Sequence, residues 1–339
     1  MSLTADDESV PALSGLAAFC LGKGEMALRR VTRSRPEPGW VTVRVRAAGL
    51  CGSDMHRIDA PEVAQGVLGH EVAGILEEIG EGTEGLSVGQ HVACLPLVPC
   101  GTCDVCAGGH PQVCPHLRSL GKDLPGGFAD FMAAPASNVR VVPDHVPLSA
   151  VAMADVLAVA MHAVNLAGHP RQRDILVLGD GSTGLACAAL LARENRVVVV
   201  GRHHARATEQ LGAKHVPAID PDSRFDVIFE AVGRKQVETL HVAIQAARPG
   251  GQIVVLGVYP AGFDGALPLR SLFYKETVLR GCNSYHPADF DAAVDRIVRG
   301  EIDTSVLVTH QIPLADFERG VALTRDRAKS GALKVVFVP

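Results

Sequence analysis

The sequence predicts an α/β protein with two domains, one rich in β-strands and one built on a doubly wound parallel sheet. Short apolar runs broken by glycine and proline fill the first part of the chain. From about Val151, apolar runs of strand length alternate with segments long enough for helices, which is the pattern of β-α-β units. A chain of 339 residues, 47% of them hydrophobic, also exceeds one compact core and suits two.

Composition excludes several classes of function. The net charge is −5 and aromatic residues make up only 4%, so neither a basic surface for nucleic acid nor a stacking platform for single strands is expected. The longest apolar stretch, Leu148 to Gly168, contains an aspartate, a histidine and an asparagine, which favours a buried helix over a membrane span. The segment Met1–Pro11 is acidic and lacks the apolar run of a secretion signal. We therefore expect a soluble, cytoplasmic protein without nucleic-acid or membrane partners.

The first region has the local signals of strands and turns. Trp40 to Arg46 alternates apolar and polar residues, which is the pattern of a half-buried strand. Turns are expected at Glu81-Gly82, Val88-Gly89 and Pro125-Gly126-Gly127. We expect an irregular, β-rich domain over residues 1–152.

The second region has the signals of a parallel sheet. Its predicted strands are Ile175–Leu178, Val197–Val200, Val227–Phe229 and Ile253–Leu256. We expect this domain over residues 153–285. A helical pattern from Asp289 to Arg299 then leads to short strands ending at Val335–Val338, and residues 286–339 are predicted to return to the first domain.

A glycine-rich loop follows the first of these strands. Residues 179–184 read GDGSTG and precede a predicted helix from Leu185 to Arg193, so the motif has the strand-loop-helix context of a Rossmann dinucleotide site. The candidate cofactor-binding residues in the loop are Gly179, Gly181, Ser182, Thr183 and Gly184. The alternative is an ordinary turn that uses glycine for its positive φ. Asp180 places a carboxylate beside the expected diphosphate, which the sequence does not explain.

The end of the second strand bears on the choice between NAD(H) and NADP(H). NAD sites place an acidic side chain there to bind the ribose 2′-hydroxyl, but this chain has no carboxylate before Glu209. Arg202 and Arg206, with His203 between them, could instead bind a 2′-phosphate. We expect NADP(H) to be favoured over NAD(H); a solvated turn or relaxed specificity is the alternative.

Four of the nine cysteines fall within fifteen residues. Without an export signal, clustered thiols favour a metal site over disulfides. The four are Cys100, Cys103, Cys106 and Cys114. Four thiolates close the tetrahedral coordination of Zn²⁺ and leave no open position, so we expect a structural zinc that holds a loop together. An iron–sulfur cluster and unrelated surface thiols are the alternatives, and the spacing is not that of a ferredoxin.

A second group of potential metal ligands lies upstream, in residues 51–56 (CGSDMH) and 69–71 (GHE). A catalytic zinc takes mixed sulfur, nitrogen and oxygen ligands and keeps a position open. Taken singly, such residues are usually core cysteines or hydrogen-bonded histidines. Their combination with a four-thiol site and a nucleotide motif favours a catalytic metal.

Together these segments resemble the zinc-dependent medium-chain dehydrogenase/reductases of the alcohol dehydrogenase superfamily. The resemblance extends through residues 126–129 (GGFA) and 331–336 (GALKVV), and thus covers nearly all of the chain after Leu16. The acidic residue Asp155 makes this segment similar to that of the sorbitol, threonine and aminocyclitol dehydrogenase branch, although Val156 replaces the family's usual proline. The resemblance implies a GroES-like catalytic domain followed by a Rossmann domain.

The resemblance also implies a set of zinc ligands. Cys51 and His70 would bind the catalytic zinc, and Glu71 and Asp155 would complete or alternate in its coordination sphere. Asp54 would orient His70, as ligating histidines generally require.

For the proton, the resemblance implies a relay on the same segment. Ser53 would contact the substrate oxygen and pass its proton through the nicotinamide ribose to His56, which opens to solvent. The alternative is that Ser53 is only a helix N-cap and His56 a surface histidine.

The implied activity is an NAD(P)-dependent oxidoreductase acting on CH–OH groups, with two zinc ions per chain. We expect reduction of a polyhydroxylated ketone, such as a sugar or aminocyclitol ketone, to its secondary alcohol. The alternatives are an NAD-dependent polyol or threonine dehydrogenase and a non-catalytic nucleotide-binding protein on the same fold.

Two further expectations concern residues 277–286. Asn283, Tyr285 and His286 are candidate substrate contacts or interface residues. Because relatives are commonly dimers or tetramers, we expect a homo-oligomer, with Thr277–Cys282 as a candidate sheet edge.

Overall fold

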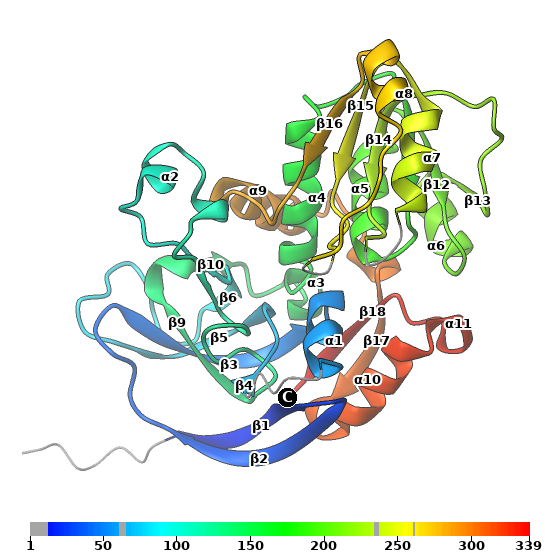
Figure 1. Cartoon of the computed structure of the whole chain (residues 1–339). Coiled ribbons are helices and arrows are strands. Elements are labelled where there is room, and N and C mark those ends of the chain that lie inside the picture. Colours follow the sequence, from blue (N-terminus) through cyan, green and yellow to red (C-terminus); the bar gives the residue numbers. More distant parts are fainter. Residues whose placement is uncertain (1–12, 61–65, 234–236, 260–261) are drawn as a thin grey trace, which may run out of the picture.

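The computed structural model describes residues 13–60, 66–233, 237–259 and 262–339. The acidic segment Met1–Pro11, which carried the expectation about secretion, lies outside them. Two bodies stack on one another in Figure 1: a β-rich one below, and one containing a parallel sheet above. The β-rich and doubly wound α/β architecture expected from the sequence is confirmed.

The lower body is built around one large sheet. Among the described residues this sheet has seven strands in the order β10-β6-β5-β3-β18-β17, with β9 also pairing with β3. The strands are β3 (Trp40–Gly49), β5 (Glu71–Ile79), β6 (His91–Cys94), β9 (Phe131–Pro135), β10 (Val139–Val142), β17 (Val308–Pro313) and β18 (Lys334–Val338). Smaller sheets are formed by β1 (Leu13–Gly22), β2 (Glu25–Arg33) and β4 (Gly66–Val67), and by β7 (Leu97–Val98) and β8 (Arg118–Ser119). Strand β3 begins at Trp40, as the alternation predicts.

The end of the chain returns to this sheet. Strand β18 pairs antiparallel with β3, and β17 pairs parallel with β18. The rings of Phe317 and Phe337 stack with centroids 4.4 Å apart, and Phe128 packs against both. These contacts fix the C-terminal strands beside the strands that carry the expected metal ligands.

The upper body contains a six-stranded parallel sheet in the order β13-β12-β11-β14-β15-β16. Its strands are β11 (Asp174–Leu178), β12 (Arg196–Val200), β13 (Lys214–Val216), β14 (Phe225–Glu230), β15 (Ala247–Val255) and β16 (Val278–Gly281). Each predicted strand is present. The chain runs outward from β11 on one side and from β14 on the other, so the direction of winding reverses between these two strands. A ligand crevice is expected at the carboxyl ends of strands at such a reversal.

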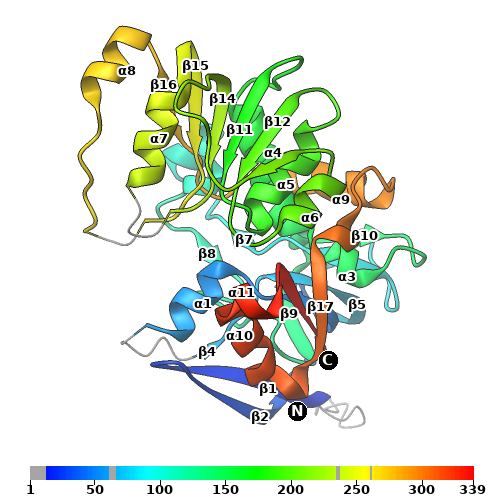
Figure 2. The same cartoon turned by 90° about the vertical axis from the view of Figure 1, so that its right-hand side faces the viewer.

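Helices cover both faces of this sheet and join the two bodies (Figure 2). Over the described residues, the helices of the two bodies together are α1 (Gly52–Ile58), α2 (Asp104–Ala107), α3 (Leu148–Val151), α4 (Ala154–Leu166), α5 (Ser182–Leu191), α6 (Ala205–Gln210), α7 (Glu238–Ala246), α8 (Leu269–Lys275), α9 (Pro287–Val298), α10 (Phe317–Arg325) and α11 (Arg327–Ser330). Helix α4 packs against α5 and α9. The helix predicted from Asp289 is α9, which begins two residues earlier.

Helices α3 and α4 lie in the long apolar stretch noted in the sequence. Among the described residues, Leu148–Leu166 is the one helical stretch long and apolar enough to cross a membrane by length and composition alone. Within its most apolar window, 56% is buried inside the protein. This burial against α5 and α9 is that of a core helix, as the sequence predicts.

Candidate active site

Helix α1 brings the first expected ligand into place. Cys51 is its N-cap, and the Cys51 N–H donates to Asp54 Oδ2 at 2.9 Å in a capping box. The other oxygen of Asp54, which is 1% exposed, lies 3.4 Å from His70 Nδ1. One buried carboxylate therefore fixes both the backbone of Cys51 and the ring of His70.

The same helix holds the expected relay residues. Ser53 and His56 both lie on exposed parts of α1. Because Cys51 occupies the N-cap, the alternative that Ser53 serves as an N-cap is wrong. The structure leaves the hydroxyl of Ser53 without that competing structural role.

His70 and Glu71 lie where β5 begins, and glycines shape the backbone around them. Gly69 has φ +93° and packs so closely under Phe128 that a Cβ there would lie 2.7 Å from the ring. A Cβ on Gly49 would lie 2.0 Å from Glu71 Oε2. Glycine at 49 and 69 thus makes room for the carboxylate and for the turn into the site.

Glu71 is held by a lysine that sequence reasoning did not assign to the site. Lys334 Nζ donates to both oxygens of Glu71, at 2.6 and 2.7 Å, and lies 3.4 Å from Leu50 O. Lys334 is 1% exposed and Glu71 is fully buried. Burial alone would lower the pKa of Lys334, but the charge of Glu71 outweighs it and the pKa is raised, so Lys334 remains a cation. The only signal in the sequence was its place in the GALKVV segment.

Asp155 has a different partner. It lies in the first turn of α4, with Oδ2 4.0 Å from His70 Nε2, and its Oδ1 accepts a short hydrogen bond from the Tyr285 hydroxyl. Tyr285 is 1% exposed, and its ring stacks on Phe290. Burial, and then the charge of Asp155, raise the pKa of Tyr285 well above its ordinary value, so the phenol keeps its proton to donate.

The other two candidates in this segment, Asn283 and His286, have different surroundings from Tyr285. Asn283 is exposed, and the His286 side chain caps α9 by accepting from Ala288 N. Of these three candidates, Tyr285 therefore belongs to the interior of the site, through its bond to Asp155.

Thiol, imidazole and carboxylate converge between these segments. One ligand atom each from Cys51, His70 and Glu71 lies within 4.8 Å of the others, and this donor set is one that zinc takes in catalytic sites. Burial opposes a positive charge on His70, but Asp54 and Cys51 outweigh it and raise the pKa of His70 well above its ordinary value. The site is therefore one that attracts a cation.

Charge balance supports the same fit. Three carboxylates are buried here, those of Asp54, Glu71 and Asp155, and Lys334 is the one buried lysine or arginine among the described residues. Burial raises the pKa of Asp155 despite the nearby His70. A divalent cation would offset this excess of buried negative charge, so the residues present fit a catalytic zinc.

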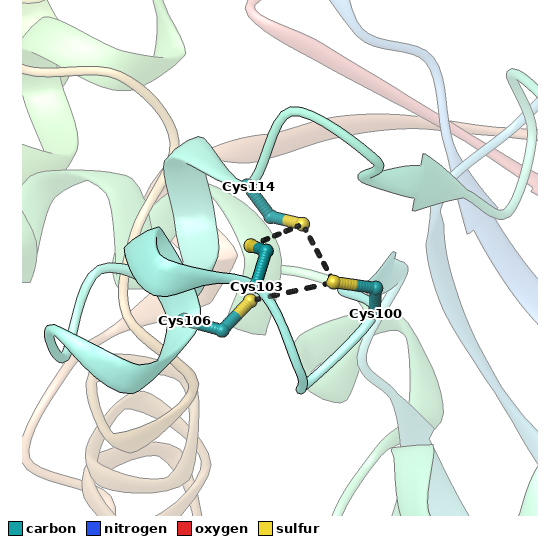
Figure 3. A group of neighbouring side chains, drawn as sticks. All are labelled: Cys100, Cys103, Cys106 and Cys114. Atoms are coloured by element: carbon teal, nitrogen blue, oxygen red, sulfur yellow. Dashed lines mark hydrogen bonds between the residues drawn. The ribbon is translucent and has the colours of Figure 1, made fainter.

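The four clustered cysteines converge in a lobe around α2 (Figure 3). The Sγ–Sγ distances are 3.5 Å between Cys114 and Cys100, 3.7 Å between Cys103 and Cys114, and 4.0 Å between Cys100 and Cys106. A tetrahedron with Zn–S bonds of about 2.3 Å has edges of about 3.8 Å. The spacing of the sulfur atoms thus fits a structural zinc.

The thiols of this lobe do not ionise alike. Backbone N–H groups of Thr102 and Cys103 lower the pKa of Cys100 to about 6, whereas burial raises the pKa of Cys106 to about 12. Four adjacent thiolates repel one another, so a cation among them is needed for all four to ionise.

The glycine-rich loop has the geometry of a dinucleotide site. Gly179 turns the chain with φ +109°, and a Cβ on Gly184 would lie 2.0 Å from Gly179 O, so helix and strand pack closely. A Cβ on Gly181 would meet open space, which leaves its backbone accessible to a diphosphate. Ser182 and Thr183 form the first turn of α5, whose N-terminus faces the same space.

The expected phosphate-binding side chains lie at the end of β12. Arg202, His203 and Arg206 are all exposed around the turn into α6. Neither arginine is held by a hydrogen bond or an ion pair to another described residue. Both guanidinium groups are thus available to a ligand at the end of this strand.

Comparisons with known proteins agree with this geometry. Residues 37–144 match the alcohol dehydrogenase GroES-like domain, and residues 145–334 match the glucose dehydrogenase C-terminus. A 2-dehydro-3-deoxy-L-galactonate 5-dehydrogenase of Pseudoalteromonas atlantica is 31% identical over 83% of this chain and 86% of its own. A sorbitol dehydrogenase of Arabidopsis thaliana is 28% identical over 95% and 94%. A Sinorhizobium meliloti protein assigned as a zinc-binding dehydrogenase and solved with NADP has a TM-score of 0.89 at 26% identity, covering 96% of this chain and 100% of that one.

Proposed function

The chain belongs to the zinc-type medium-chain dehydrogenases of the alcohol dehydrogenase superfamily, and from this premise we propose that it transfers hydride between NADP(H) and a polyhydroxylated secondary alcohol or its ketone. Its class, an oxidoreductase of the sugar-alcohol dehydrogenase type that acts on CH–OH groups with NAD(P), follows from the family. Ketone reduction is the proposed physiological direction, because NADPH generally serves reduction.

The observation that carries the proposal is the convergence of Cys51, His70 and Glu71, with the buried carboxylates of Asp54 and Asp155 beside them. A zinc ion bound there would polarise the substrate oxygen. Cys51 and His70 are the proposed firm ligands. Asp155 is the proposed third, because no described residue donates a hydrogen bond to its Oδ2, which lies 4.0 Å from His70 Nε2, while both oxygens of Glu71 are bonded to Lys334. Glu71 would alternate with it.

The remaining residues act on orientation and on the proton. Asp54 would hold the ring of His70 through Nδ1 so that Nε2 faces the metal. Ser53 would exchange a proton with the substrate oxygen, and His56 would release it to solvent by way of the cofactor ribose. Both lie on the same short helix as Cys51, which supports their joint assignment.

The preference for NADP(H) rests on the end of β12. The absence of an acid at Gly201 and the exposed guanidinium groups of Arg202 and Arg206, with His203, favour a 2′-phosphate. The NADP-bound relative supports this choice. We also propose a homo-oligomer in the cytoplasm, two zinc ions per chain, and domain limits at residues 152 and 285.

Initial rates on a panel of keto-sugars and aminocyclitol ketones with NADPH and NADH, and on polyols and threonine with NADP and NAD, test the proposal. We expect NADPH to be used with the lower KM and polyhydroxylated ketones to be reduced. The double variant R202A/R206A should raise the KM for NADPH by about tenfold or more and change that for NADH little. A lower KM for NADH in the unmodified enzyme would reject the cofactor assignment, and turnover of threonine alone would reject the substrate class.

A further inference from the structure

The carboxylate inside the glycine-rich loop does not face the diphosphate. Asp180 Oδ2 accepts hydrogen bonds from the backbone N–H groups of His203, at 2.7 Å, and His204, at 2.8 Å. His215 Nε2 on β13 lies 3.4 Å from the same oxygen. Asp180 is 7% exposed. Its side chain therefore turns towards the neighbouring strand and holds the turn that follows β12.

Gly201 explains why the carboxylate fits there. A Cβ on Gly201 would lie 2.1 Å from Asp180 Cγ and 2.3 Å from its Cβ and Oδ2, which no real side chain could occupy. Residue 201 directly follows β12, the second strand, where NAD sites carry their acidic side chain. In this chain the space of that side chain is filled from residue 180. Asp180 and Gly201 thus form a matched pair: the carboxylate is attached after β11, at residue 180, instead of after β12, at residue 201.

The carboxylate of Asp180 has different hydrogen-bond partners from an acidic side chain that would follow β12 at residue 201. Burial opposes its ionisation, but the N–H groups of His203 and His204 outweigh burial and lower the pKa of Asp180. Its negative charge is therefore stabilised by the backbone N–H groups of His203 and His204 in the interior of the protein. The groups left exposed above it are basic, those of Arg202 and Arg206.

We propose that Asp180 is the positioning residue for recognition of the 2′-phosphate of NADP(H): it holds the turn 201–204 so that Arg202, His203 and Arg206 surround the ribose. The inference rests on the proposed cofactor and deepens it. Asp180 Oδ2 is bonded to two N–H groups of the turn, which leaves only Oδ1 as an acceptor for a ribose hydroxyl. The competing outcome, that Asp180 binds the 2′-hydroxyl of NAD(H), is decided by the test.

Equilibrium binding of NADPH and NADH to the zinc-loaded protein, followed by nicotinamide fluorescence, provides the test without turnover. In D180A the Kd for NADPH should rise by about tenfold, because the turn loses both of its anchoring bonds. The Kd for NADH should change by less than about threefold. D180N keeps an oxygen that can accept from the same N–H groups and should restore most of the NADPH affinity. E209A removes an exposed carboxylate on α6 that bonds to no other described residue, and it serves as the matched control.

An exchange of the pair sharpens the test. G201D alone should disturb folding, since its side chain overlaps Asp180, and thermal unfolding reports this. D180A/G201D moves the carboxylate to the strand end and should bind NADH more tightly than NADPH. Weaker NADH binding with unchanged or tighter NADPH binding in D180A would overturn the inference. A preference of the unmodified protein for NADH would instead reject the proposed cofactor, while the change caused by D180A still decides the role of Asp180.

Discussion

Replacing Lys334 with methionine removes the one cation that, among the described residues, pairs with the fully buried carboxylate of Glu71. The side chain keeps nearly its length, but both bonds to Glu71, at 2.6 and 2.7 Å, are lost. Glu71 is fully buried and Lys334 is 1% exposed, so water cannot replace the ammonium group. Breaking a buried pair in this way costs about 3–5 kcal/mol. That is a large part of the 5–15 kcal/mol, roughly, that stabilises a typical domain.

Urea unfolding of the chelator-treated protein measures this loss. Trp40 is the single tryptophan, and β3, which contains it, pairs with the strand that Glu71 begins, so its fluorescence reports on the affected sheet. The double variant E71Q/K334M removes the buried charge as well and should recover most of the lost stability. Zinc should stabilise K334M more than the unmodified protein, because Glu71 is then free to turn to the metal.

Two results would refute this reasoning. If K334M unfolded within about 1 kcal/mol of the unmodified protein, the pair would be no more than a surface contact in effect. If E71Q/K334M were no more stable than K334M, the loss would come from packing of the lysine stem rather than from an unpaired carboxylate.

Three further predictions test the site and the sheet. Y285F removes the hydrogen bond that orients Asp155, so the affinity for the catalytic zinc, measured by chelator competition, should fall by about 10-fold or more. An unchanged zinc affinity at both metal sites would contradict this role. C100S should reduce zinc content from two ions per chain to one while the ligand-field absorption of cobalt bound at the catalytic site stays as before; loss of both metals would contradict separate sites. R196M removes the main cause of the lowered pKa of Asp174, so NMR titration should show that pKa rising towards about 3.9. A carboxylate whose pKa is lowered by folding stabilises the protein at pH values above its unfolded pKa, and this contribution is lost as the pH falls through its folded pKa. R196M lacks most of this contribution, so it should lose less stability than the unmodified protein below about pH 4. An unchanged acid transition and an unchanged pKa of Asp174 would contradict that assignment.

Elements with a strong local pattern could be predicted from the sequence. The strands β11, β12, β14 and β15 were predicted because continuous apolar runs alternate with helix-length segments. The metal groups could be found because ligand chemistry restricts residue types, and short spacing places them together. Helix α1 was not predicted, since its seven residues are too few for a periodic pattern, and its start is fixed by the capping box between Cys51 and Asp54.

What could not be predicted are partners distant along the chain. Lys334 lies 263 residues from Glu71, and Tyr285 lies 130 residues from Asp155. No local pattern marks a lysine or a tyrosine for such a role, because the pairing exists only once β18 lies beside β3 and the turn before α9 reaches α4. Likewise Asp180 was an unexplained acid in the loop until the structure placed it against a distant turn.

These distant partners leave the carboxylates of Asp155 and Glu71 unequally free to turn towards a metal. Asp155 is held through one oxygen by a neutral phenol and keeps the other facing His70, whereas both oxygens of Glu71 are bonded to a cation. Detaching Glu71 from Lys334 costs a buried ion pair, while Asp155 needs no bond broken to turn Oδ2 to the metal. If the two carboxylates alternate at one zinc, the exchange is therefore unequal: Asp155 is the resting ligand, and Glu71 takes part only when the metal itself offsets the separation from the lysine.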